Sequence, residues 1–447
     1  ARRAGTLTSL ELFDCGLGAA GARAVAGLLG PEGRLERLGL NEIGDEGVVH
    51  IADALGRDGS LVALDLACGG QRTVAPPAPP GAGGLPLAPG KEGGAHYAVS
   101  RDVYADHPEA PAACHPIRWR GCATLAAALA RNMALRELCL YNNAVGDSGA
   151  LALASSLRQN RTLRALDLGQ NGISGKGIVA LAEALGARVA HAPPTTVGTL
   201  ISKASAIGQF TGLKMGDEMF GIEPNATLED LDVASGPGEP ADLGDDAAHA
   251  LRDLLAGTKA LRRLKVDAAG PAAAAVAAGL AENESLRTLE LGVWDASADG
   301  ARELGDVIRG HTTLRHLRVH GVRPLGEGRG GRRFDDGDDV STLLAAVAED
   351  VSALLAAVAD PRPDGGLEAL HFALNMYMPD VNIDGLACGL ASNTRLAELE
   401  LVGDFCGTDA LGAALGRSPS LRRVVFNGQL PEGTVAALAA GLCNNRS

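Results

Sequence analysis

The sequence predicts an α/β solenoid built from stacked strand–turn–helix units, and three observations carry that prediction. Residues 135–160 and 163–185 repeat one another with a constant offset of 28 residues, and self-similarity at such a period is the signature of a repeat architecture. Each of these units opens with L-x-x-L-x-L, whose alternating apolar residues are typical of a strand with one buried face. Each then continues through a glycine into leucines four residues apart, which places them on one face of a helix.

The unit recurs about twelve times along the 447 residues, with declining fidelity. Its helical half is clearest at residues 47–55, 121–132 and 300–308. The asparagine of the turn is kept only at Asn143 and Asn171, so we expect the later turns to be less regular. One unit cannot bury its apolar side alone, whereas stacked neighbours can. The leading leucines of the repeats are Leu7, Leu35, Leu61, Leu135, Leu163, Leu228, Leu261, Leu286, Leu314, Leu367, Leu396 and Leu421.

Residues 164–177, RALDLGQNGISGKG, look like a phosphate-binding loop between a strand and a helix. A loop that cradles phosphate needs G-x-x-x-x-G-K-[ST], so that backbone N–H groups surround the anion and a hydroxyl reaches the magnesium ion. Here Gly175 and Lys176 are followed by Gly177, and Gln170 stands where the first glycine should be. The stretch is therefore better explained as one period of the repeat, with Lys176 as a variable residue at a loop-to-helix junction.

The alternation of L-x-x-L-x-L-x-x-N with a full helix resembles the leucine-rich repeats of the ribonuclease-inhibitor type. That family includes ribonuclease inhibitors, the sensor ends of NOD-like receptors and Ran GTPase-activating proteins. The resemblance implies a horseshoe with a parallel sheet on its concave side and helices on its convex side. We treat residues 1–447 as a single leucine-rich-repeat domain. We expect it to be a fragment of a longer protein, because no polar capping repeat is visible at either end.

Three insertions interrupt the period of the repeat. Residues 69–118 begin with a Pro- and Gly-rich run of the composition found in disordered linkers. Residues 189–225 carry enough apolar side chains to predict an ordered excursion, and residues 321–340 predict a Gly-rich loop with interleaved arginines and aspartates. Just beyond that loop, residues 341–350 are echoed by residues 352–361, and this duplication should lengthen one convex helix.

The composition excludes several classes of function. A formal net charge of −14 argues against binding to nucleic acids or acidic membranes, and no apolar stretch is long enough to predict a transmembrane helix. The cysteines form no C-x-x-C pair, and scattered thiols of this kind predict reduced side chains in a cytoplasmic protein. The polar residues between His96 and His115 fit no zinc-ligand spacing. We therefore expect no catalytic, cofactor-binding, metal or small-molecule site.

A protein-binding surface is expected on the strands, because their non-leucine residues alternate onto one shared face of the sheet. The residue between the last two apolar positions of each strand is acidic in six of the repeats, and basic residues gather around the seventh and ninth repeats. We expect Asp65, Asp167 and Asp232 to form a broad field rather than a dyad, since layers or insertions separate them. The candidate partner-binding residues are Glu11, Asp65, Asp167, Asp232, Lys265, Glu290, Arg315, Arg318 and Glu400.

The sequence thus favours a non-enzymatic scaffold that binds a protein partner of complementary charge through its concave face. Two alternatives remain at this point. One is a regulator that activates a GTPase, by resemblance to Ran GTPase-activating proteins, which act with an arginine near the start of the horseshoe. Arg23, Arg34 and Arg37 lie near that end, but no surrounding motif assigns the role to any of them. The other is the sensor end of a larger NOD-like receptor.

Overall fold

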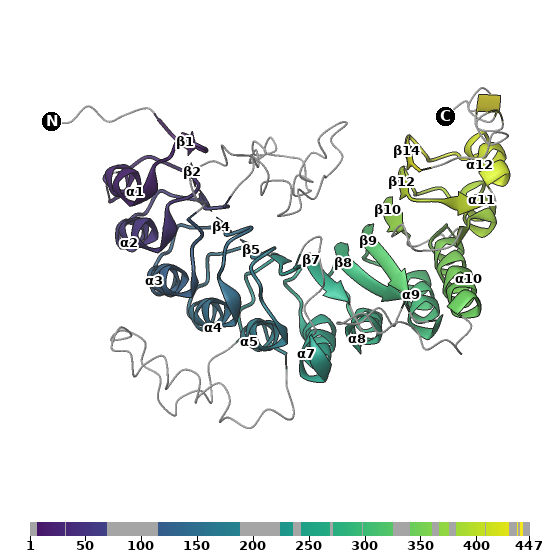
Figure 1. Cartoon of the computed structure of the whole chain (residues 1–447), viewed down its shortest axis with the longest axis horizontal. Coiled ribbons are helices and arrows are strands. Elements are labelled where there is room, and N and C mark those ends of the chain that lie inside the picture. Colours follow the sequence, from purple (N-terminus) through teal and green to yellow (C-terminus); the bar gives the residue numbers. More distant parts are fainter. Residues whose placement is uncertain are drawn as a thin grey trace.

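The protein forms one curved array in which helices line the outer side and strands line the inner side (Figure 1). The inner, concave side is therefore a continuous sheet, as the sequence predicts. The chain is described here from a computed structural model. The residues that the structure describes are 7–31, 33–68, 115–187, 224–235, 243–268, 271–296, 298–324, 340–359, 366–374, 381–406, 408–428, 436 and 439–440.

The main sheet has twelve strands, all parallel and ordered as they occur along the chain. Each strand falls on one of the predicted L-x-x-L-x-L segments, so the expected number of repeats is confirmed. The strands are β1 (Ser9–Leu12), β2 (Arg37–Leu40), β3 (Ala63–Asp65), β4 (Glu137–Cys139), β5 (Ala165–Asp167), β6 (Asp230–Asp232), β7 (Arg263–Ala268), β8 (Thr288–Ala296), β9 (His316–Pro324), β10 (Ala369–Leu374), β12 (Glu398–Val402) and β14 (Arg423–Asn427). A second, two-stranded sheet joins β11 (Val381–Asn382) and β13 (Phe405–Cys406).

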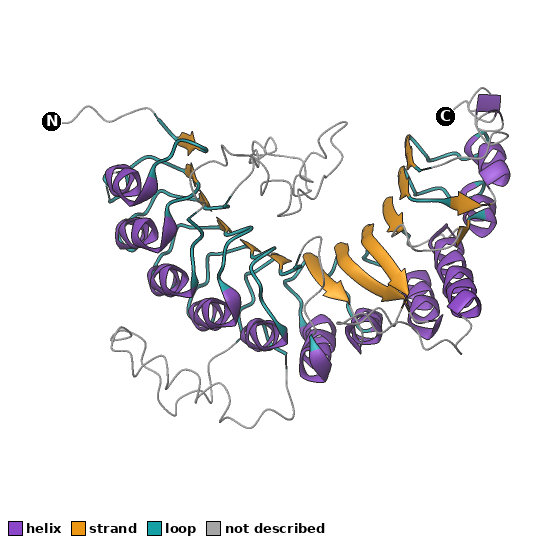
Figure 2. Ribbon diagram, in the orientation of Figure 1, coloured by secondary structure: helices purple, strands orange, loops and turns teal. Residues whose placement is uncertain are grey.

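Helices follow the strands and stack side by side on the convex side (Figure 2). The longest, α10, has 20 residues and contains the duplicated segment, which confirms that the duplication lengthens one helix. None of the helices within the described ranges is long and apolar enough to cross a membrane. The helices are α1 (Gly18–Ala26), α2 (Gly44–Leu55), α3 (Trp119–Leu129), α4 (Gly146–Leu157), α5 (Gly175–Ala184), α7 (Gly244–Gly257), α8 (Pro271–Ala281), α9 (Ala298–Gly310), α10 (Val340–Ala359), α11 (Asp384–Leu390) and α12 (Thr408–Leu415).

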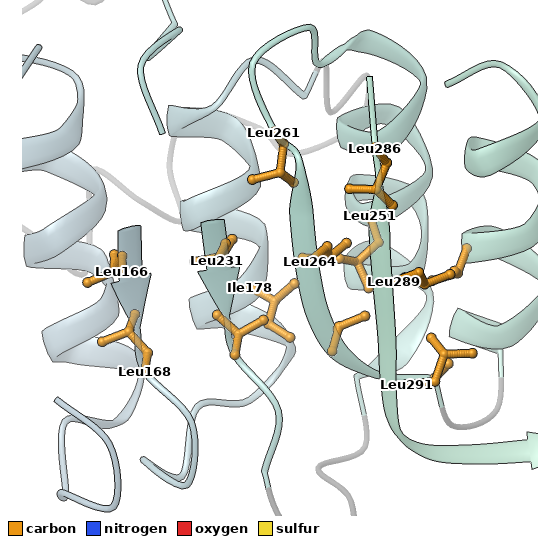
Figure 3. Close-up of a cluster of buried hydrophobic side chains, with 14 of the residues drawn as sticks. Leu166, Leu168, Ile178, Leu231, Leu251, Leu261, Leu264, Leu286, Leu289 and Leu291 are labelled. Atoms are coloured by element: carbon orange, nitrogen blue, oxygen red, sulfur yellow. The ribbon is translucent and has the colours of Figure 1, made fainter. Parts of the chain in front are cut away.

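The core is a continuous layer of leucines between the sheet and the helices (Figure 3). Leu264 and Leu289, from neighbouring strands, are completely buried there, as are the leading leucines Leu135 and Leu286. Each such side chain contributes about 1.5–3 kcal/mol by leaving water. Among the leading leucines Leu7, two residues before β1 in the first repeat, is the exception, since it is 54% exposed.

A ladder of asparagines, which the sequence analysis missed, joins the repeats where each helix returns to the next strand. Asn160 stands three residues before Leu163, and its Oδ1 accepts the N–H group of that leucine at 2.8 Å. Its Nδ2 donates to the carbonyls of Leu129 and Asn132, in the preceding repeat, at 2.8 and 3.0 Å. Each asparagine therefore satisfies buried backbone groups of two repeats at once. The same position is held by Asn132, Asn225, Asn283 and Asn393, and elsewhere by Asp58, Thr258, His311 and Ser418.

The ladder corrects the predicted boundary of the second insertion. Asn225 was assigned to the insertion, but it is buried and donates to the carbonyls of Leu157 and Asn160, both at 2.8 Å. It is therefore the ladder residue of its repeat. The ordered excursion expected between residues 189 and 223 lies outside the described residues.

The other two insertions are also shorter than predicted. Ile117 is buried in the core, and its carbonyl accepts the N–H group of Ala144 at 2.9 Å, so the repeat has resumed before residue 118. The third insertion was expected to begin at residue 321, yet residues 321–324 continue β9. In both places, backbone hydrogen bonding with the neighbouring repeat continues into residues whose composition alone predicts an insertion.

The turns after the early strands are regular, as expected. Asn142 and Gln170, at equivalent positions, both have φ near +56°, at 55° and 57°. Asn143 and Asn171 donate through Nδ2 to the carbonyls of Leu140 and Leu168 at 3.1 and 2.9 Å. The later repeats differ, because β7 to β10 lengthen to between six and nine residues.

The N-terminus of α5 confirms that residues 164–177 are a repeat and not a phosphate loop. A Cβ atom on Gly175 would collide with the carbonyl oxygen of Leu243, so the next repeat covers the start of the helix. The carboxylate of Asp147 accepts the N–H groups of Ser174 and Gly177 at 2.7 and 3.1 Å. An acidic side chain thus occupies the position where an anion would bind.

The expectation of reduced thiols holds for part of the chain. Among the described residues Cys15, Cys122, Cys139, Cys388 and Cys406 form no disulfide. The expectation is wrong at Cys68, which is disulfide-bonded.

Candidate functional site

The residues predicted to share the concave face form one row across the sheet. Each member is in register with the next, from Glu11 opposite Gly39 at one end to Glu400 opposite Val425 at the other. Eight of the nine candidate residues belong to this row. Arg315 does not, because it precedes β9 and pairs with Glu368 at 3.5 Å. The row is Glu11, Gly39, Asp65, Cys139, Asp167, Asp232, Lys265, Glu290, Arg318, His371, Glu400 and Val425.

One expectation about this row is wrong: Asp167 and Asp232 are direct neighbours. They are partners in the register of β5 and β6, and the carbonyl of Asp232 accepts the N–H group of Leu168 at 2.8 Å. β5 and β6 are neighbours in the sheet although residues 189–225 lie between them in the sequence. Neighbouring strands lie about 4.8 Å apart, so the two carboxylates belong to adjacent positions.

Each of these aspartates also holds the turn that follows its strand. The Oδ1 atoms of Asp65, Asp167 and Asp232 accept the backbone N–H groups two residues further on, at 3.0, 3.0 and 3.1 Å. Side-chain oxygens of this kind fix a turn by replacing a backbone acceptor. These aspartates therefore stabilise the turns of the fold and are also candidates for a binding surface.

Ion pairs across the strands occupy the middle of the row. Lys265 contacts Asp232 at 2.8 Å, and Arg263 contacts Asp230 at 3.1 Å and Glu290 at 3.0 Å. Burial would raise the pKa of the Glu290 carboxyl, but the neighbouring cations, led by Arg263, hold that pKa below its usual value. At Asp230 burial dominates and raises the pKa despite Arg263.

Histidines cluster beyond the ion pairs, on β9 and β10. The rings of His320 and His371 lie 4.6 Å apart, and His371 Nδ1 is 3.1 Å from a carboxylate oxygen of Glu400. Burial, followed by the proximity of His371, lowers the pKa of His320 to about 4. Burial also lowers the pKa of His316. His320 is therefore neutral at pH 7.

On the N-terminal half of the face, aromatic rings lie close to glycines. A Cβ atom on Gly169 would stand 3.0 Å from Tyr141 Cδ2 and 3.1 Å from Asp232 Oδ1. A Cβ atom on Gly39 would stand 2.6 Å from Phe13 Cζ. The sequence analysis did not select Tyr141. The sequence signal that could have indicated Tyr141 is Gly169, which occupies the same position of the next repeat.

The two halves of the face differ in charge. In the described part of β1 to β6 and the residues just after these strands, the only basic side chain on the face is Arg37, which lies 4.0 Å from Glu137. The acidic side chains there are Glu11, Asp65, Glu137, Asp167, Asp230 and Asp232. From β7 onward the described acidic and basic side chains alternate and pair with one another. The strands of the N-terminal half thus carry more acidic than basic side chains, although Asp230 and Asp232 are paired with Arg263 and Lys265 of β7.

Stacked strand–helix units, a parallel sheet on the inner side and a leucine layer between them define the class: the chain is a leucine-rich repeat protein with an α/β solenoid fold. A family model described as "Leucine Rich repeat" matches residues 6–26, 37–52, 131–154 and 159–182. The matched segments fall on the most regular repeats. The sequence matches none of the curated proteins.

Two examples illustrate the similarity of solved structures to parts of the chain. One is the C-terminal domain of tropomodulin from Caenorhabditis elegans, at 12% identity and a TM-score of 0.24, covering 36% of this chain and 75% of that one. The other is actin-binding site 2 of leiomodin-1, at 14% identity and a TM-score of 0.18, covering 52% of this chain and 72% of that one. Similarity at this level carries no argument about function.

Proposed function

We propose that this protein is a non-enzymatic scaffold that binds a protein partner on its concave sheet. The observation that carries the proposal is the twelve-stranded face itself, which no helix of the described chain covers (Figure 2). Solenoids present such extended concave surfaces, and sites on them are made by side chains rather than by enclosed cavities. Polar residues in strict register supply the specificity, because complementary charge selects a partner.

Three finer features belong to the same proposal. In β1 to β6, the pairing of three- or four-residue strands with helices of about three turns supports the ribonuclease-inhibitor type of repeat. The net charge of −14 supports a protein partner rather than nucleic acid, an acidic membrane or a small molecule. The cysteines among the described residues that form no disulfide support a cytoplasmic location, while the disulfide at Cys68 runs against it.

Site-specific photo-crosslinking tests which face binds. A photoreactive phenylalanine analogue is placed at Ala165 or Ala369, both half-buried on the concave face, and at exposed Glu303 on convex α9 as the control. The full-length protein is crosslinked in cell extract, and the adducts are identified by mass spectrometry. We expect one shared partner from the concave positions and none from Glu303. Adducts formed at Glu303 alone would contradict a concave binding face.

A further inference from the structure

We infer that Cys68 forms a disulfide with Cys114, and that this bond closes residues 69–113 into a covalent loop at the rim of the concave face. Cys68 is disulfide-bonded, and the cysteine to which it is joined lies outside the described residues. The inference is independent of the proposed function, because it concerns a covalent bond within the chain and not the binding of a partner.

Elimination leaves two candidates for the bonded cysteine. The chain has eight cysteines. The described ones other than Cys68 form no disulfide, and they are Cys15, Cys122, Cys139, Cys388 and Cys406. The bond therefore joins Cys68 to Cys114 or to Cys443, both of which lie outside the described residues.

Backbone hydrogen bonds place the described residues on both sides of the first insertion against one turn, residues 141–144. Before the insertion, the N–H group of Cys68 donates to the carbonyl of Tyr141 at 3.0 Å. After the insertion, the carbonyl of Ile117 accepts the N–H group of Ala144 at 2.9 Å. Cys68 and Ile117 therefore lie beside the same turn, at the end of β4.

The reach of the chain then favours Cys114 over Cys443. Cys114 precedes Ile117 by three residues, which span at most about 10 Å, and the Cα atoms of a disulfide lie about 4.4–6.8 Å apart. Cys443 also stands three residues from the described chain, but residues 439–440 lie at the end of the array that carries α12 and β14 (Figure 1). Nine strand positions separate β14 from β3, about 40 Å along the sheet, and three residues cannot span that distance.

The bond forms by thiol–disulfide exchange with a low-molecular-weight disulfide such as oxidised glutathione. One cysteine thiolate attacks the small disulfide, and the second attacks the resulting mixed disulfide. Two cysteine thiols are thereby oxidised to one S–S bond, while the small disulfide is reduced to two thiols that carry the two protons. The closed loop restricts the unfolded chain, so the bond stabilises the folded repeat that begins at β3.

Peptide mapping under non-reducing conditions tests the connection. The full chain is equilibrated in a glutathione redox buffer, its remaining thiols are alkylated, and it is digested with trypsin. The peptides that carry Cys68, Cys114 and Cys443 are residues 58–72, 102–118 and 424–446, respectively. We expect 58–72 and 102–118 to be joined and to separate after reduction. A link from 58–72 to 424–446, a covalent dimer on a non-reducing gel, or no link to 58–72 would each overturn the inference.

Two matched variants give an independent readout, the number of thiols titrated in the oxidised and then unfolded protein. Cys114→Ser should raise that number by one relative to the parent protein, because Cys68 loses its bond and becomes a thiol. Cys443→Ser should lower it by one, because it removes a cysteine that forms no bond. The reverse pattern would assign the disulfide to Cys443 and overturn the inference.

Discussion

At the scale of the residue, the asparagine ladder explains how buried backbone groups are satisfied between repeats, and His311 is its weakest position. His311 Nδ1 accepts the N–H groups of Thr313 and Leu314 at 3.3 and 3.0 Å, as the asparagine oxygens do elsewhere. Its Nε2 is buried and makes no hydrogen bond of good geometry within the described structure, although the backbone of Asn283 interacts with the ring. A buried polar atom without a partner costs about 1–3 kcal/mol.

We therefore predict that His311→Asn stabilises the protein. The amide would accept the same two N–H groups and could donate to a carbonyl of the preceding repeat, as Asn283 donates to Leu255 at 2.6 Å. The urea midpoint of unfolding should rise by an amount equivalent to about 1 kcal/mol. The control is His249→Asn, on the exposed side of α7. An equal effect of both variants would count against the ladder explanation.

The buried His320 makes stability depend on pH. Its pKa in the folded protein is about 4, below its ordinary value of 6.5, so the unfolded chain binds the proton more readily. The stability contribution is full above about pH 6.5 and is lost as the pH falls toward about 4, by up to about 3 kcal/mol. The groups facing this imidazole are His371, Glu290, Lys265 and Arg318.

The measurement is a series of urea unfolding curves across that pH range. His320→Gln should flatten the pH dependence between pH 6.5 and about 4 relative to the parent protein. His249→Gln, the surface control, should leave it unchanged. If the stability of His320→Gln depends on pH as steeply as that of the parent protein, other groups cause the loss of stability at low pH.

At the scale of the element, acidic residues near the start of one helix cap the next helix. Asp45 Oδ1 accepts the N–H groups of Arg118 and Gly121, at 2.7 and 3.1 Å, at the start of α3. Asp147 does the same for α5 and also accepts the Ser174 hydroxyl at 2.6 Å. Residues 69–114 lie between β3 and α3 in the sequence. The helices nevertheless stay stacked, because Asp45 of α2 caps α3 directly.

We predict that Asp147→Ala loosens α5 in particular. It leaves two backbone N–H groups and one hydroxyl without their acceptor, which should cost about 1–3 kcal/mol. Hydrogen exchange should accelerate at the amides of α5 more than in α1 or α2. Asp246→Ala, at an exposed position in the first turn of α7, is the control. Unchanged exchange in α5 would show that the cap contributes little.

At the scale of the whole molecule, the contacts between the described elements are mainly those between neighbouring layers along the curve (Figure 1). Stability in such an array is approximately a sum of repeat and nearest-neighbour terms. A destabilising substitution in one repeat should therefore affect mainly that repeat and its neighbours. Part of the solenoid can unfold while the rest stays folded.

Leu264→Ala tests this. The side chain is completely buried in the middle of the sheet (Figure 3), and its truncation should cost about 2–5 kcal/mol. Loss of hydrogen-exchange protection should be greatest in β6 to β8 and should leave β1 and β2 nearly unchanged. Leu28→Ala, at a half-exposed position, should have little effect. Uniform loss of protection along the chain would contradict local coupling.

The sequence by itself determined the number of repeats, the parallel order of the strands and the register of the concave row. The reason is that leucines at fixed spacing have only one way to face a shared core. It could not determine that Asp167 and Asp232 are adjacent, because an inserted segment lengthens the sequence between two strands without showing whether they remain neighbours in the sheet. Only the tertiary structure decided which carboxylates are held by Lys265, Arg263 or a turn, and that Tyr141 lies over Gly169. Those contacts depend on side chains meeting across strands that are far apart in sequence, and no local pattern encodes them.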